Sequence, residues 1–559
     1  MVPRKVQTDQ ILRPNLSKYL LYTEKKYPGM TSVRRRSARR GGASSSSSLG
    51  SGSVQDLSGS VLKDHENIKA PHSRVRNKGS FFPFLVILLL AAMMRIFMAS
   101  FPYSGQATPP RFGDFEAQRN WMAITLSVPI RLWYKFDLEY WGLDYPPLTA
   151  FHSYVCGLYV RLFEPDAMVS PITSRGIETE ALKTAMRTTV LFSDLAIFMP
   201  AAYALASALY PSDTRKRLTS FAAMALQPLL VAIDHGHFQY NCVSVGLATA
   251  AAAVLVRRRH FGNDVLSAIL YVAAIFHKHM ALYYAPAFFA IMLGDAVRDA
   301  NGSAKQSILR VARLGVVVIL AAAACLGPFA LDVSLLRDVI DRLLPFGRGV
   351  YEDYVSNFWC ATNPVLRWKT YDATIMSKVC AVATVVACIP AGVLSGCKRG
   401  TGSDSRAVVP LTLAGTAISF FLFAFQVHEK GVLYAAMPIA ALAPDAPLAS
   451  IGFGAASVLS CRDLLVRDGV FPPAVLAVVV YACAIMSGCK GVCTRVRRAE
   501  AVVISACLAM VGATFTLPLV LGAAPLGPRY PYVYAAIDAA LYFTFYACAW
   551  LYVLRLLIQ

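Results

Sequence analysis

The sequence predicts an all-α protein that crosses a membrane many times. Of its 559 residues, 56% are hydrophobic and only 16% are charged, whereas a water-soluble domain carries about 25% charged residues. Apolar segments such as 81–100, 314–331 and 535–554 recur more than ten times, and each is long enough to cross a bilayer as a helix, which takes about 20 residues. They are rich in Ala, Leu and Val and do not alternate with polar residues, which argues against a transmembrane β-barrel.

Residues 1–80 differ in composition from the rest of the chain. They hold 16 Lys or Arg and 5 Asp or Glu, so they supply +11 of the formal charge of +21, and a Ser/Gly-rich run follows the arginines. This composition predicts a disordered, basic tail rather than a nucleic-acid-binding domain. Segment 81–100 is internal and is expected to act as an uncleaved membrane anchor. By the positive-inside rule the tail is cytosolic.

The distribution of Lys and Arg predicts which loops share the cytosolic side with the tail. The first crossing places the polar segment 101–147 on the opposite side. From residue 215 onward, basic loops alternate with loops of mixed charge as far as the C-terminus. The loops expected in the cytosol are 215–217, 257–259, 398–406 and 490–498, and those expected on the other side are 331–372 and 428–430.

Between residues 145 and 215 this scheme requires an odd number of crossings. Two segments, 148–163 and 188–209, are candidates. The first is short and contains His152, so we expect it to be a short or membrane-parallel helix and the second to be the full span. The total is then about 14 spans.

Ionisable residues at or inside an apolar layer are costly, which makes them functional candidates. Five polar clusters interrupt the apolar pattern, and all of them fall on the predicted non-cytosolic side. Taken singly, each fits a structural role: a helix cap, a rigid Tyr-Pro-Pro turn, an interfacial histidine or a local ion pair. Together they favour one polar reaction cavity. The clusters are 113–121, 140–147, 234–241, Arg348 with Glu352 and Asp353, and 427–430, and Lys278 between two histidines is a further outlier.

A protein-bound metal is not expected. The 13 cysteines lie mostly in apolar runs, where a free thiol behaves as a small hydrophobic group. His235 and His237 are two residues apart, with no third ligand at a familiar spacing.

Three strings carry a family resemblance: Gly-Asp-Phe-Glu-Ala-Gln-Arg-Asn-Trp at 113–121, Tyr-Trp-Gly-Leu-Asp-Tyr-Pro-Pro with its continuation at 140–153, and His-Gly-His-Phe-Gln-Tyr-Asn at 235–241. They resemble the motifs of the endoplasmic-reticulum α-1,3-glucosyltransferases that use dolichyl phosphate glucose in N-glycan assembly. Segments 344–349, 357–360 and 427–430 extend the likeness, which spans roughly residues 81 to 445.

The resemblance implies a GT-C-type glycosyltransferase fold with about 14 transmembrane helices in the endoplasmic-reticulum membrane. It divides the chain into the tail (1–80), a catalytic membrane module (81–445) whose luminal loops 101–147 and 331–372 hold the active site, and C-terminal transmembrane helices (446–559).

Gly-Asp-Phe-Glu-Ala-Gln and Trp-Gly-Leu-Asp-Tyr-Pro-Pro-Leu-Thr-Ala are similar to the branch that adds the first glucose. The family usually has Lys-Gln-Met where this chain has Lys278-His279-Met280. The expected function is transfer of the first glucose from dolichyl phosphate β-glucose to a terminal mannose of the dolichyl-diphosphate-linked oligomannose, in an α-1,3 linkage. The alternatives are the second-glucose enzyme of the same pathway and, in a different class, a polytopic transporter of lipid-linked sugar, which would be expected to show two repeated halves.

The chemistry of such a transfer defines the residue types that the site needs. The attacking hydroxyl needs a base, for which a carboxylate suits an oxocarbenium-like transition state. Asp114 is the expected base, with Glu116 as runner-up. The departing phosphate needs positive charge, for which the candidates are Arg348, His428, Lys430 and Lys278. The other residues expected to bind substrate are Arg119, Trp121, Trp141, Asp144, Tyr145, His235, His237, Gln239 and Tyr240.

A single base implies one displacement with inversion at the anomeric carbon. A monophosphate donor offers no diphosphate for a divalent ion to chelate, so the reaction is expected to be independent of metal and of any cofactor. The expected partners are the two dolichyl-linked substrates and membrane lipid, with no nucleic acid.

Overall fold

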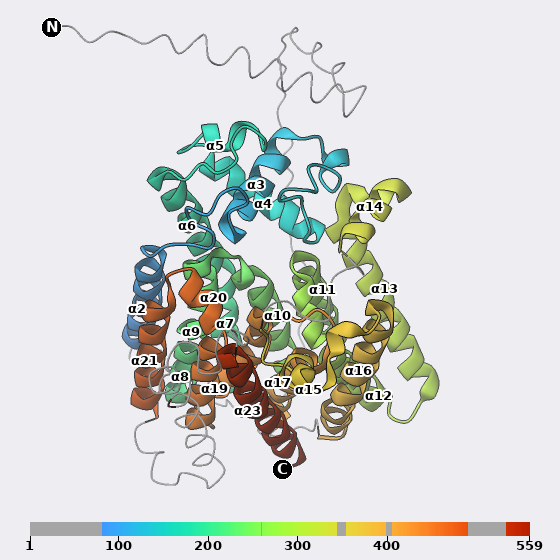
Figure 1. The fold of residues 1–559 in the computed structure, drawn as a ribbon. Helices are drawn as coiled ribbons and strands as arrows, with labels where there is room; N and C mark the ends of the chain where they lie inside the picture. The colour runs from blue at the N-terminus through green and yellow to red at the C-terminus, as the bar shows by residue number, and fades with distance from the viewer. Residues whose placement is uncertain (1–80, 259, 344–353, 399–404, 490–511, 513–532) are drawn as a thin grey trace, which may run out of the picture. The chain divides into compact units, whose positions relative to one another are not determined.

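The computed structural model describes residues 81–258, 260–343, 354–398, 405–489, 512 and 533–559. Regular structure in these ranges is helical and includes no β-strand, which confirms the predicted all-α class (Figure 1). The predicted tail, residues 1–80, lies outside the described residues.

Nine helical segments in the described ranges are long and apolar enough to cross a membrane, as expected of a multi-pass membrane protein. Three shorter apolar helices accompany them: α10 (Asn241–Val256), α11 (Phe261–His277) and α19 (Pro447–Leu459). The expected total of about 14 spans also depends on residues that are not described. The nine segments are α2 (Phe81–Ala99), α6–η2–α7 (Glu180–Leu209), α8–α9–η3 (Thr214–Phe238), η4–α12 (His279–Asp299), α13–η5 (Ala304–Leu331), most of α16 (Ala373–Lys398) and of α17 (Ser405–Phe423), α21 (Phe471–Gly488) and α23 (Val533–Ile558).

The stretch between residues 145 and 215 contains one full-length candidate span. Helix α4 (Pro147–Val160) has only 14 residues and is not among the nine segments, whereas Glu180–Leu209 has 30 residues and is one of them. By length and composition, the expectation that the second segment is the span is therefore confirmed.

Helix α10 packs between α7 (Met199–Leu209) and α11. Its sequence is rich in Ala, Gly, Ser and Thr, which lets neighbouring backbones approach closely in a membrane. At Gly246 an added Cβ would lie 3.0 Å from the Cα of Phe198 in η2 (Asp194–Phe198). The small residues therefore bring α10 close to η2, and the start of α10 reaches the polar centre described below.

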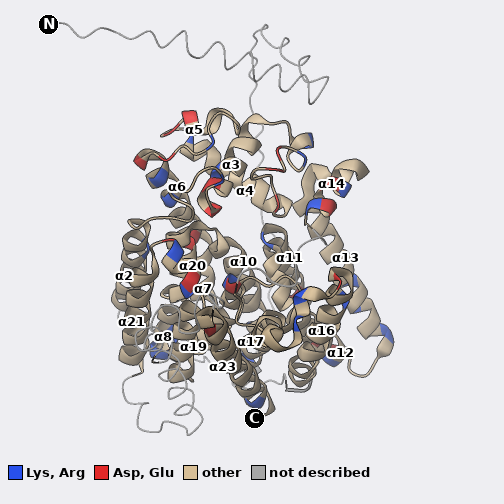
Figure 2. Ribbon diagram, viewed as in Figure 1, with Lys and Arg blue, Asp and Glu red and all other residues tan. Residues whose placement is uncertain are grey.

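Helices outside the nine spans gather around α3 (Asp114–Ser127). This helix packs against α4 and α5 (Asp166–Val169), and the three lie at one end of the bundle in Figure 1. A contact with α14 (Val333–Leu343) joins the two loops expected to be catalytic, because Arg342 Nε donates to the carbonyl oxygen of Leu143 at 2.9 Å. Figure 2 shows acidic and basic positions around α3, α5 and α6, in contrast to the uncharged α21.

The span Thr214–Phe238 ends in a π-helical stretch, η3 (Val231–Phe238). Such stretches are frequent at functional sites. At its end Phe238 is fully buried and has a φ of 89°, a left-handed conformation that costs a non-glycine residue about 1–3 kcal/mol. The surrounding packing offsets this cost and sets the direction in which His237 and Gln239 leave the helix.

The predicted sidedness can be tested with natural glycosylation acceptors. Asn15-Leu16-Ser17 and Asn301-Gly302-Ser303 match the acceptor pattern, and Asn301 is exposed between α12 (Ala285–Asp299) and α13 (Ala304–Leu326). Both should stay unmodified in the endoplasmic reticulum because both are predicted to be cytosolic. The measurement is the gel mobility of the chain before and after treatment with an N-glycosidase.

An engineered acceptor provides the matching positive control. Asp341→Asn combined with Leu343→Thr places an Asn-Arg-Thr acceptor at the end of α14, where Asp341 is exposed. This acceptor should be glycosylated. Modification of Asn301 instead would show that the crossing count between residues 145 and 215 is wrong by one.

Candidate active site

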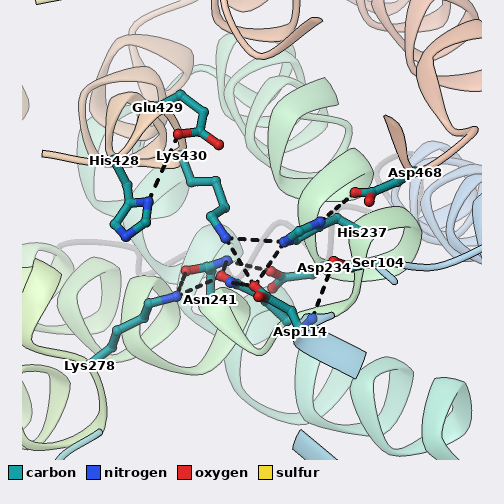
Figure 3. A network of polar contacts seen from close by, with 11 residues as sticks. Ser104, Asp114, Asp234, His237, Asn241, Lys278, His428, Glu429, Lys430 and Asp468 are labelled. Carbon is teal, nitrogen blue, oxygen red and sulfur yellow. Dashed lines mark hydrogen bonds and ion pairs between the residues drawn. The ribbon is translucent and has the colours of Figure 1, made fainter. Parts of the chain in front are cut away.

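Asp114 is the point where three distant parts of the chain meet. It is the first residue of α3, and its backbone N–H donates to Ser104 Oγ at 3.2 Å. Its Oδ2 atom accepts hydrogen bonds from His237 Nε2 at 2.8 Å, from Gln239 Nε2 at 2.5 Å and from Lys430 Nζ at 3.0 Å (Figure 3). The strings at 113–121, 235–241 and 427–430 therefore form one centre.

The two oxygens of the Asp114 carboxylate differ in their surroundings. Every hydrogen bond and ion pair between this carboxylate and a described residue goes to Oδ2. The side chain is nevertheless 29% exposed. Oδ1 is therefore the oxygen available to a substrate.

The charges around Asp114 keep it ionised. Burial by itself would raise the pKa of Asp114, but the positive charge of Lys430 and the contact with His237 outweigh burial and hold the pKa well below its ordinary value. For Lys430 the balance is reversed in sign: burial would lower its pKa, whereas Asp114 and Glu429 outweigh burial and raise it. At neutral pH the pair is therefore a carboxylate facing an ammonium group.

His237 is held from both sides of its ring. Its Nδ1 lies 2.5 Å from Oδ2 of Asp468, and its Nε2 lies 3.1 Å from Lys430 Nζ in addition to the contact with Asp114. Asp468 follows α20 (Arg462–Arg467) and is buried. Asp468 is not among the site residues predicted from the sequence. The available signal was the polar break that Arg462, Asp463, Arg467 and Asp468 make between two apolar helices.

A second layer orients Gln239. Lys278 Nζ donates to Gln239 Oε1 at 2.7 Å and to Asn241 Oδ1 at 2.6 Å. Asn241 Nδ2 donates to Gln239 Oε1 at 3.0 Å and to Asp234 Oδ1 at 2.7 Å. With its oxygen fixed on these donors, the amide of Gln239 turns its N–H groups toward Asp114.

Lys278 was an expected ligand of the donor phosphate, and the structure shows it bound to side chains of the protein. The residue is only 2% exposed, and its ammonium group is occupied by Gln239 and Asn241. It also lies 5.0 Å from the ring centroid of Tyr145, a cation–π contact. Lys278 therefore holds Gln239 and Asn241 in place, and Gln239 in turn contacts Asp114.

Glu116 and Arg119 bind one another rather than the centre. Arg119 donates from Nε and Nη2 to the two oxygens of Glu116, each at 2.7 Å, and both side chains are buried. Arg119 also donates to the carbonyl oxygen of Ala167 and to Ser174 Oγ, and Tyr140 donates to Glu116. The pair therefore fastens α3 to segment 167–176, and these contacts favour Asp114 over Glu116 as the base.

His235 faces away from Asp114. Its Nε2 lies 3.0 Å from Asp194 Oδ2, which also accepts from Arg95 Nε at 2.7 Å, and all three side chains are buried. Tyr240 is likewise engaged inside the protein, with its hydroxyl 2.7 Å from Thr189 Oγ1. Both residues therefore have partners inside the protein, and their contact with substrate stays a prediction.

We expect Asp194→Asn to destabilise the protein strongly, because Arg95 would keep a buried charge without its counter-ion. Removing one partner of a buried ion pair costs about 3–5 kcal/mol. The measurement is the thermal unfolding temperature of the purified protein, with Asp445→Asn as control, because Asp445 pairs with Lys216 where both are 44% exposed. Equal unfolding temperatures for the two variants would contradict this role.

The aromatic residues expected to touch sugar line the loop that follows α3. Trp121 is buried, donates to the carbonyl oxygen of Gly142 and packs against Tyr145 with ring centroids 4.9 Å apart. Trp141 is half-buried and donates to the carbonyl oxygen of Arg111 at 2.6 Å. Asp144 is half-buried in the same loop. Of the aromatic pair Trp121 and Trp141, Trp141 is the more exposed.

Of the expected phosphate ligands, His428 and Lys430 flank Glu429 beside the centre (Figure 3). His428 is 38% exposed, with Nδ1 at 3.9 Å from Glu429 Oε2. Arg348 lies outside the described residues. A cavity of about 600 Å³ is lined by Glu429 and by Arg467, so it adjoins the segments that supply Lys430 and Asp468, but Asp114 does not line it.

The family model and the individual proteins that match this chain indicate the same family. Residues 85–555 match the ALG6, ALG8 glycosyltransferase family. The chain is 39% identical over 406 residues to the "Probable dolichyl pyrophosphate Man9GlcNAc2 alpha-1,3-glucosyltransferase" of Arabidopsis thaliana, covering 71% of this chain and 73% of that protein. It is 36% identical over 393 residues to the Gallus gallus "Dolichyl pyrophosphate Man9GlcNAc2 alpha-1,3-glucosyltransferase", covering 69% and 75% of the two chains, and 37% identical to a "probable" enzyme of that name from Drosophila melanogaster, covering 71% and 82%.

Proposed function

Because the chain belongs to the ALG6, ALG8 glycosyltransferase family, we propose that it is the α-1,3-glucosyltransferase that adds the first glucose to dolichyl pyrophosphate Man9GlcNAc2. The family resemblance seen in the sequence motifs is confirmed. The relatives compared are named for an acceptor that carries no glucose, which favours this function over the second-glucose alternative. They are named as transferases, which likewise disfavours the transporter.

One observation in the site supports transferase chemistry most strongly. Asp114 is ionised, three donors hold its Oδ2, and its Oδ1 is left for a ligand. A carboxylate oxygen that is fixed in place and open on one side is what a general base requires. The site thus has a group that can take the proton of an acceptor hydroxyl.

The proposed donor is dolichyl phosphate β-glucose. The acceptor hydroxyl attacks the anomeric carbon and its proton passes to Asp114 Oδ1. The bond between the anomeric carbon and the phosphate oxygen breaks, and the phosphate leaves with the electron pair. One displacement on a β-linked donor gives an α-linked product.

Lys430 connects the base to the leaving group in this scheme. Its ammonium group contacts Asp114, and His428, two residues earlier in the chain, is 38% exposed. A donor phosphate bound by these two residues would compete with Asp114 for the charge of Lys430. The pKa of Asp114 would then rise as the phosphate gains charge. Proton acceptance would be favoured at the point in the reaction where the hydroxyl becomes acidic.

A GT-C-type fold with about 14 spans, in the endoplasmic-reticulum membrane with a luminal site, is part of the same proposal. It is supported by the family and by the alternation of basic loops. The proposal also extends the catalytic module beyond residue 445, and the contact of Asp468 with His237 supports this extension.

The direct test uses the purified full-length chain in lipid nanodiscs with synthetic dolichyl phosphate glucose. Dolichyl pyrophosphate Man9GlcNAc2 should gain one glucose, and an acceptor that already carries one glucose should gain none. Preference for the glucosylated acceptor would select the second-glucose alternative. Movement of lipid-linked sugar across the bilayer without transfer would select the transporter.

A further inference from the structure

The proposed mechanism of glucose transfer does not use the contact between Asp468 and His237. The two residues are 231 positions apart, and His237 Nδ1 lies 2.5 Å from Asp468 Oδ2. The opposite ring nitrogen, Nε2, lies 2.8 Å from Asp114 Oδ2. In Figure 3 the imidazole ring lies between Asp468 and Asp114, so the three side chains form one chain of hydrogen bonds.

The number of protons that these three hydrogen-bonded side chains share indicates the role of Asp468. An ionised carboxylate only accepts hydrogen bonds, so a carboxylate oxygen 2.5 Å from Nδ1 and another 2.8 Å from Nε2 favour a proton on each ring nitrogen. His237 is then an imidazolium that donates to both aspartates. Lys430 Nζ, 3.1 Å from Nε2, opposes this state because it brings a second positive charge to the ring. The carboxylate of Asp468 offsets that repulsion.

The other charged groups near His237 come from several elements. Asp114 is on α3, Lys430 on η7 (Glu429–Val432) and Asp468 after α20. On α6 (Glu180–Ser193), Arg187 donates to the carbonyl oxygen of Gly236 at 2.7 Å. Of these charged groups, Asp468 is the one that accepts a hydrogen bond from Nδ1 of His237.

The placement of Asp468 is well defined. It is buried, its backbone N–H donates to the carbonyl oxygen of Leu464 at 3.1 Å, and the next residue, Gly469, has a φ of 71° that favours glycine. The turn after α20 therefore directs the carboxylate at the ring. A carboxylate that holds an imidazole through Nδ1 sets both the orientation of the ring and its protonation.

We propose that Asp468 is a positioning residue for glucose transfer: it keeps His237 oriented and doubly protonated, so that Nε2–H holds Oδ2 of Asp114 and leaves Oδ1 to the acceptor hydroxyl. Asp468 touches no reacting atom and acts through His237. This inference rests on the proposed function.

The test compares Asp468→Asn with the wild-type full-length chain in the glucose-transfer assay. Asparagine keeps the shape of the side chain and removes its charge. We expect kcat to fall about 10- to 100-fold, as for other partners that orient a reacting group, with the donor KM within about threefold of wild type. Asp468→Glu, which restores the charge, should recover part of the loss. Asp445→Asn, which removes an aspartate that is 44% exposed and paired with Lys216, should match wild type.

Two further readouts separate positioning from a loss of folding. With a neutral His237, Asp114 loses part of the positive charge that lowers its pKa, so the acid limb of the kcat–pH profile should move to higher pH in Asp468→Asn. In a His237→Ala background, Asp468→Asn should cost little more, because the two residues act in one chain.

The outcomes decide between the inference and its alternatives. An unchanged kcat and acid limb in Asp468→Asn would overturn the inference, as would full additivity with His237→Ala. A fall in the yield of folded protein with a normal kcat per folded molecule would reduce Asp468 to a structural residue. A wild-type chain that transfers no glucose would instead overturn the proposed function, so the two failures are distinguishable.

Discussion

Asp114→Asn is expected to lower kcat by about 10²-fold or more, with the fold intact and the donor KM within a few-fold of wild type. The amide keeps the shape of the carboxylate but cannot take the proton of the acceptor hydroxyl, and a positioned base contributes about 10²–10⁴ in rate. Because the loss lies in the transition state, it should appear equally in kcat and in kcat/KM. The measurement is steady-state glucose transfer by the purified variant, normalised to folded protein.

Glu116→Gln is the matched comparison, since Glu116 lies on the same helix two residues away. Its pairing with buried Arg119 predicts a lower unfolding temperature and a nearly normal kcat for the molecules that remain folded. The reverse pattern, with Asp114→Asn active and folded Glu116→Gln inactive, would transfer the role of base to Glu116.

Lys430→Met should be the second most damaging substitution, with a loss of about 10²-fold in kcat, the typical effect of removing one group that stabilises charge in the transition state. The variant loses a donor to Asp114 Oδ2 and a cation beside the leaving phosphate. Its pH dependence is also predicted. Lys430 lowers the pKa of Asp114, so without it that pKa rises, and the acid limb of the kcat–pH profile should move to higher pH.

Lys216→Met is a suitable control for Lys430→Met. Lys216 is also paired with an aspartate, Asp445, at 2.7 Å, but both side chains are 44% exposed, and Lys216 lies near the start of the candidate span Thr214–Phe238 whereas His237 lies at its end. It should leave kcat and the acid limb unchanged. If Lys430→Met behaves in the same way, the donor phosphate must be held elsewhere, and Arg348→Ala would then be the variant to examine.

Much of the centre could be predicted because the sequence places its ionisable residues where they are costly. Asp114, His237 and Lys430 stand at the ends of apolar segments, where an unpaired charge is unfavourable and a functional partner is expected. The same reasoning applied to Arg95, inside the first span, would have predicted its buried partner, Asp194.

The other contacts of the centre depend on the direction in which each side chain points, and the spacing of residues in the sequence does not specify that direction. His235 and His237 are two residues apart, yet the π-helical stretch turns one toward Asp194 and the other toward Asp114. Glu116 and Arg119 have the i, i+3 spacing of a helical ion pair, which the motif reading did not use. Asp468 reaches the centre only through the packing of α20, which the order of residues does not reveal.

The proposed reaction is a single displacement assisted by one carboxylate, so the anomeric configuration of the transferred glucose reports on it without the need for a variant. The purified wild-type chain is given dolichyl phosphate β-glucose with ¹³C at the anomeric carbon, and the linkage in the product is determined by NMR and by digestion with an α-glucosidase. We expect an α-linked glucose that the α-glucosidase removes. A β-linked product would mean net retention through a second nucleophile, and would contradict the role assigned to Asp114.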